Sequence, residues 1–109
     1  MTADELARAV DRLVDHIGQW TPSRWTASTA ASGAVSRADT VHALAQRLAD
    51  LEASATGRQE RPVPRLDNDL VLPDQLRVTA RDLLAAHPPE PVLAAAADAV
   101  ADARRALSS

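Results

Sequence analysis

The kinds of apolar side chain in this sequence limit the folds that it can form. The chain has two tryptophans but no phenylalanine, tyrosine or cysteine, and Ile17 is its only isoleucine. Its core therefore has to be built mainly from leucine, valine and alanine. Alanine and leucine favour helices, whereas a set this poor in aromatic residues makes a poor β-sheet. The composition predicts an all-α protein.

Four segments carry apolar residues at the alternating three- and four-residue spacing of an amphipathic helix. This spacing predicts helices over Ala3–Gly18, Arg37–Ala55, Pro73–His87 and Pro91–Leu107. Thr2 and Glu5 form a capping-box pair at the first helix start. Ser36 and Asp39 mark the start of the second helix, and Gly57 supplies its stop. None of the four is long enough to be stable alone, so we expect a four-helix bundle that forms one domain over residues 1–109.

Two long connections without helical periodicity join the first three helices. Residues 19–35 hold both tryptophans and then a run of small residues, and residues 58–72 contain an Arg-Pro-Val-Pro-Arg sequence that favours an extended path. The third connection is a short joint at Pro88 and Pro89, which predicts that the last two helices are antiparallel neighbours. The two long connections leave the rest of the topology open.

The tryptophans Trp20 and Trp25 lie close together in the first long connection. One interpretation is that they plug one end of a core that lacks other aromatic residues. The other is that they are exposed anchors for a partner, because tryptophan is enriched at interface hot spots. Either or both residues are therefore candidates for an interaction surface.

The second long connection carries Arg58, Arg61 and Arg65 around its Pro-Val-Pro segment. In one interpretation Val63 and Leu66 dock on the bundle and the arginines are solvated. In the other, the arginines form a recognition strip for an acidic partner or for a partner with a proline-binding groove. Together with the tryptophans, these three arginines are the candidate interaction residues.

The histidines His16, His42 and His87 lie on three different predicted helices. In an up-down-up-down bundle these positions meet at one end, where three imidazoles can hold a zinc ion with an open fourth position. A structural role is the alternative, because the helix dipole also favours histidine near a helix C-terminus. A connection over residues 19–35 that spans the whole bundle would instead carry His42 to the opposite end.

Several function classes have no support in this sequence. Its glycines are isolated, so no phosphate-binding loop is present, and no nucleophile stands in a recognisable catalytic pattern. We therefore expect neither enzymatic activity nor a cofactor. A net charge of −3 disfavours nucleic acid as a partner. No apolar run reaches the roughly 20 residues of a membrane span, and no signal-peptide pattern is present, so the cytoplasm is the expected location.

All twelve basic residues are arginine rather than lysine. The residue types that the chain lacks have mostly AT-rich codons, which indicates a bacterial genome rich in GC.

These observations favour a small, non-enzymatic interaction protein that binds another protein or itself. Val78 lies nearly opposite Leu76 on the third predicted helix, so the bundle core cannot cover both side chains. The segment with Val63 and Leu66, or a second copy of the chain, would cover Val78, and we expect a homodimer. The alternative is a helical bundle that binds a metal ion or a small ligand through the histidines at one end.

Overall fold

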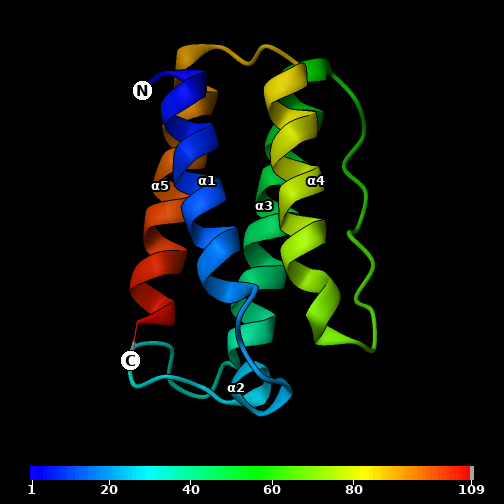
Figure 1. Ribbon diagram of the computed structural model, residues 1–109. Coiled ribbons are helices and arrows are strands. Elements are labelled where there is room, and N and C mark those ends of the chain that lie inside the picture. Colours follow the sequence, from blue (N-terminus) through cyan, green and yellow to red (C-terminus); the bar gives the residue numbers. More distant parts are fainter. Residues whose placement is uncertain (109) are drawn as a thin grey trace.

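The computed structural model describes residues 1–108 as a bundle of four long helices (Figure 1). The long helices are α1 (Ala3–Ile17), α3 (Arg37–Thr56), α4 (Leu72–Ala85) and α5 (Glu90–Leu107). Two single turns precede α3 and α4, namely α2 (Pro22–Thr26) and the 3-10 turn η1 (Asp69–Val71). No β-strand occurs in the described residues. The predicted all-α fold is confirmed, and each helix begins and ends within two residues of its predicted bounds.

Local signals in the sequence account for most of the helix ends. The hydroxyl of Thr2 accepts a hydrogen bond from the Glu5 amide at 3.1 Å, and the hydroxyl of Ser36 accepts one from the Asp39 amide at 3.1 Å. Gly57 ends α3 in the left-handed conformation, with φ of 72°. These contacts are the capping interactions that the sequence patterns predict.

The end of α4 has a different cause. His87 follows the helix with φ of 49°, which is unusual for a residue other than glycine. Pro88 follows it directly, and the residue before a proline is disfavoured in the right-handed helical region. The chain therefore leaves the helix at His87 and turns toward α5.

The long helices run in two parallel pairs, α1 with α5 and α3 with α4 (Figure 1). The starts of α1 and α5 lie together, and there the Met1 ammonium donates a hydrogen bond to Glu90 Oε1 at 3.1 Å. This contact raises the pKa of the ammonium. Each helix packs against its parallel partner and against one helix of the other pair, α1 against α4 and α3 against α5. The predicted position of the last two helices is therefore wrong, since α4 and α5 are antiparallel but lie diagonally across the bundle.

One hydrophobic cluster runs along the bundle and contains side chains from all four long helices. Most of its members are leucine, valine and alanine, as the composition predicts. Ala45, Ala80, Ala96 and Ala103 are buried in this cluster and allow the helices to approach one another closely. No helix of residues 1–108 is long and apolar enough to cross a membrane.

Candidate functional site

The two tryptophans form a plug at the end of the bundle where α1 finishes. Trp25 is 0% exposed and Trp20 is 7% exposed, and their rings meet edge to face with centroids 4.9 Å apart. Pro22 at the start of α2 and the Thr21 hydroxyl, which accepts from the Arg24 amide, set the turn that points Trp25 inward. The burial of both indoles agrees with the interpretation as a core plug. Neither indole is an exposed anchor.

Polar contacts fasten the rest of this connection to the bundle. The buried Arg37 guanidinium donates hydrogen bonds to the carbonyl oxygens of Arg24 and Ala27, at 3.4 and 3.3 Å. The Thr29 hydroxyl donates to the carbonyl oxygen of Ala106 at the end of α5, at 2.6 Å. The connection is therefore held to both α3 and α5.

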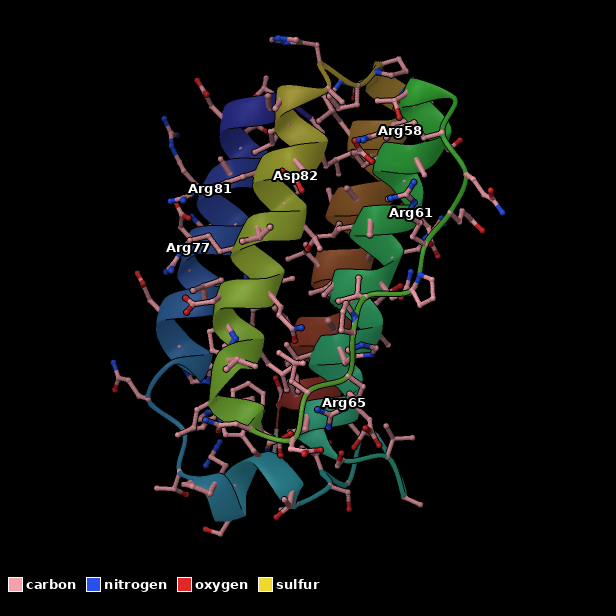
Figure 2. The ribbon with its side chains drawn as sticks, turned by 90° about the vertical axis from the view of Figure 1, so that its right-hand side faces the viewer. Arg58, Arg61, Arg65, Arg77, Arg81 and Asp82 are labelled. Atoms are coloured by element: carbon pink, nitrogen blue, oxygen red, sulfur yellow. The ribbon has the colours of Figure 1, made fainter. Side chains whose placement is uncertain are left out.

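The second connection is an extended segment, Arg58 to Asn68, that we call the strap. It runs along the outside of the bundle from the end of α3 back to the level of its start (Figures 1 and 2). Gln46 of α3 holds its centre, because its Oε1 accepts from the Val63 amide at 2.7 Å and its Nε2 donates to the Arg61 carbonyl at 3.0 Å. The side-chain amide of Gln46 thus provides hydrogen-bond partners for one N–H and one carbonyl group of the strap backbone.

Two further side chains hold the strap on either side of Gln46. His42 Nε2 donates to the Val63 carbonyl at 2.9 Å, and Gln75 Nε2 of α4 donates to the Pro64 carbonyl at 2.9 Å. Because a carbonyl oxygen only accepts, Nε2 of His42 carries the hydrogen in this contact. Sequence reasoning missed the roles of Gln46 and Gln75, and only their positions on helix faces next to an extended segment could have suggested them.

The strap arginines differ in their surroundings. Arg58 forms an ion pair with Glu52, and Arg65 lies between Asp69 at 3.0 Å and Asp39 at 3.4 Å. These two side chains hold the strap to its surroundings. Arg61 is exposed, and no ion pair of its guanidinium occurs within residues 1–108. Arg61 is thus the strap arginine most available to a partner.

The strap and α4 enclose an apolar groove of about 440 Å³, which we call the strap groove. Pro62, Val63 and Pro64 form one wall, and Val71 and Val78 lie on the other. Val78 is 54% exposed, so the strap does not cover it. The predicted docking of the strap is correct for Val63, which is half-buried.

Docking of the other predicted strap residue does not occur, because Leu66 is 46% exposed. A second hollow of about 350 Å³ adjoins the groove, and Arg58, Arg61 and Asp82 lie around it. Figure 2 shows these three side chains on the same side of the molecule. The strap face is therefore apolar in the groove and charged along its edges.

The three histidines do not share one end of the bundle. His16 lies against Trp20, with ring centroids 5.7 Å apart, and His42 is bound to the strap. His87 lies at the opposite end, because the strap crosses the length of the bundle and α4 then runs parallel to α3 (Figure 1). No three histidine, aspartate or glutamate residues within the described part of the chain are placed to hold a metal ion. The predicted convergence of the histidines is therefore wrong for His87, whereas the last turn of α1 with His16 and the first turns of α3 with His42 lie at the same end of the bundle (Figure 1).

Of the strap arginines predicted as interaction residues, Arg61 lines the strap groove, and Arg58 lines the adjoining hollow. Comparison of the chain with protein-family models, with curated proteins and with solved structures finds no match.

Proposed function

We propose that this protein is a non-enzymatic interaction protein, that the strap groove is its binding surface, and that a second copy of the chain occupies the groove. The observation that carries the proposal is the half-exposed Val78 beside an apolar wall of Pro62, Val63 and Pro64. Apolar surface gathered in a groove is typical of interaction sites.

The groove is suited to binding because both of its walls are held in place. Val63 and Pro64 are attached through their backbones to Gln46 and Gln75, and the opposite wall belongs to α4. A surface that is ordered before binding loses little conformational entropy when a partner docks. The apolar contact is therefore not offset by the cost of ordering a loop.

The charges around the groove favour a second copy as the occupant. Arg61 and Asp74 line the groove itself, and Arg58 and Asp82 lie around the adjoining hollow. In a two-fold symmetric interface the same patch faces itself, so it needs both signs of charge. This surface meets that requirement, whereas a uniformly charged partner would meet like charges.

Sedimentation equilibrium across a wide protein concentration range tests this proposal. We expect the wild-type mass to rise toward twice the chain mass with concentration, and Val78→Asp to keep the monomer mass. Val35→Asp is the matched control, because Val35 is 47% exposed but lies in the first connection, away from the groove. This control should dimerise like the wild type.

Two results would overturn the proposal. One is a monomer mass for the wild type at every concentration. The other is a dimer that Val78→Asp and Val35→Asp weaken equally, because the interface would then lie elsewhere. Thermal unfolding of both variants checks that they remain folded, as expected for substitutions at exposed positions.

A further inference from the structure

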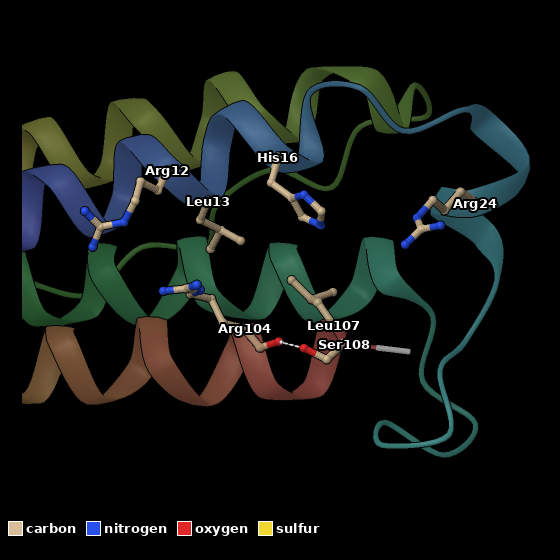
Figure 3. A pocket seen from close by; sticks show the side chains of 7 residues that line it. All are labelled: Arg12, Leu13, His16, Arg24, Arg104, Leu107 and Ser108. Atoms are coloured by element: carbon tan, nitrogen blue, oxygen red, sulfur yellow. Dashed lines mark hydrogen bonds between the residues drawn. The ribbon is translucent and has the colours of Figure 1, made fainter.

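A third pocket lies at the plugged end of the bundle, between α1, α2 and α5 (Figure 3). Its volume is about 410 Å³, within the range of small-molecule sites. The buried side chains of Leu13 and Leu107 form part of its lining. The pocket therefore combines an apolar surface with access to solvent.

The polar side chains around this pocket are mostly basic. Arg12 and His16 come from α1, Arg24 comes from α2, and Arg104 comes from α5. Figure 3 shows Arg12 and Arg104 together at one end of the pocket and Arg24 at the other end, with His16 between them. We call this site the basic pocket.

The basic pocket contrasts with the rest of the charged surface. Among residues 1–108 no carboxylate lines it, and Arg12, Arg24 and Arg104 form no ion pair. Elsewhere in the chain, four arginines form ion pairs with carboxylates, namely Arg58, Arg65, Arg77 and Arg105. The net charge of the whole chain is −3, so the gathering of positive charge is local. A cleft lined by one sign of charge attracts ligands of the opposite sign.

Arg24 is held in place by its surroundings. Its guanidinium lies over the Trp20 ring, 5.2 Å from the centroid, and its carbonyl oxygen accepts a hydrogen bond from Arg37. The buried Trp25 next to it in the chain anchors α2. One wall of the basic pocket is thus part of the same packed unit as the tryptophan plug.

We infer that the basic pocket binds a small organic phosphate, with the phosphate between Arg12 and Arg104 and the apolar body against Leu13 and Leu107. Arginine binds phosphate through pairs of N–H donors, and guanidinium groups from two helices, α1 and α5, can approach a tetrahedral anion from different sides. A carboxylate is planar and offers two oxygens, so it would engage fewer of these donors. This inference is independent of the strap groove.

Phenyl phosphate is a suitable probe, because it joins the phosphate to a small apolar ring. Calorimetric titration at constant ionic strength should show saturable binding to the wild type. Arg12→Ala and Arg104→Ala should each weaken the affinity by about tenfold or more, since each removes a charge-assisted hydrogen bond. Arg81→Ala is the matched control, an exposed arginine on α4 that should leave the affinity unchanged. Val78→Asp should also bind like the wild type, which separates this test from that of the groove.

Trp20 provides a second readout, because it contacts both His16 and Arg24. Phenyl phosphate should change the tryptophan emission of the wild type with the same saturation as in calorimetry, and Arg104→Ala should shift that curve to higher concentration. Inorganic phosphate should bind more weakly, since it makes no contact with the leucines, and phenylacetate should bind more weakly because it lacks the tetrahedral anion.

Three results would overturn the inference. The first is the absence of saturable binding, and the second is an equal loss of affinity in Arg81→Ala and Arg104→Ala, which would indicate unspecific attraction to charge. The third is binding of phenylacetate or inorganic phosphate as tight as that of phenyl phosphate, which would contradict the assigned ligand class.

Discussion

The connection over residues 19–35 and the strap both lack helical periodicity, but different interactions hold them to the bundle. The first connection buries two indole rings in the core and adds a few polar contacts around them. The strap buries little, and side chains of α3 and α4 bind its backbone instead. A long connection can therefore be ordered by what it buries or by what binds its backbone.

These two modes of attachment have different energetic consequences. Burial of a large aromatic side chain stabilises the whole domain, so the first connection and the bundle should unfold together. A hydrogen bond contributes about 0.5–1.5 kcal/mol net, so a few of them can break while the bundle persists. We expect the strap to open locally in a native molecule, whereas the tryptophan plug should not.

The largest expected effect is that of removing the plug. Trp25→Ala should lower the free energy of unfolding by about 3–5 kcal/mol, because it leaves a cavity at the end of the core. Chemical denaturation followed by circular dichroism measures this change. Val35→Ala, at an exposed position in the same connection, should change it by less than about 0.5 kcal/mol. A loss below about 1 kcal/mol for Trp25→Ala would show that the bundle does not depend on the plug.

A smaller effect is expected at the centre of the strap. Gln46→Ala should lower the free energy of unfolding by about 1–3 kcal/mol, because it removes hydrogen bonds to Val63 and Arg61. Hydrogen exchange should then accelerate at the Val63 amide while amides in the middle of α3 stay protected. Gln59→Ala, on the strap itself, is the control and should leave exchange at Val63 unchanged. Equal acceleration in the strap and in α3 would contradict local opening.

Each of the two connections also contains a glycine in the left-handed conformation. Gly57 at the start of the strap and Gly33 in the first connection have φ of 72° and 66°, and no atom lies within 4 Å of an added Cβ at either. Alanine at each position therefore meets only the backbone cost of a left-handed conformation, about 1 kcal/mol. Thermal unfolding should show this loss for Gly57→Ala, which ends a helix, and no larger loss for Gly33→Ala. A loss at Gly33 larger than that of Trp25→Ala would indicate that the first connection depends on its turn more than on its tryptophans.

The smallest expected effect is that of a strap ion pair. Arg65→Ala removes contacts with Asp39 and Asp69, and its side chain is partly exposed. Such pairs contribute about 0–1 kcal/mol and weaken with added salt. Denaturation at low and high salt should show a small difference between wild type and variant that shrinks as the salt concentration rises. A loss comparable with that of Gln46→Ala would mean that charge, rather than backbone binding, holds the strap.

Local sequence patterns were sufficient to predict the helices. The apolar spacing of α1 and α5, the Thr2 and Ser36 caps and the stop at Gly57 depend on residues within a few positions of one another. Interactions at such short separation do not depend on how the chain folds elsewhere, so the sequence determines them by itself. The shortage of aromatic residues likewise indicated that the tryptophans could act as a plug.

The direction of α4 was decided only by the tertiary structure, and the positions of the functional candidates follow from it. The entropic cost of closing a connection grows slowly with its length. A connection as long as the strap therefore allows α4 to begin at either end of the bundle. Crossing to the far end separated His87 from His16 and placed the Pro62–Pro64 wall beside Val78. The tertiary structure likewise decided that Arg12, Arg24 and Arg104 line one pocket, because these residues are distant in the sequence and only the packing of their helices places them there.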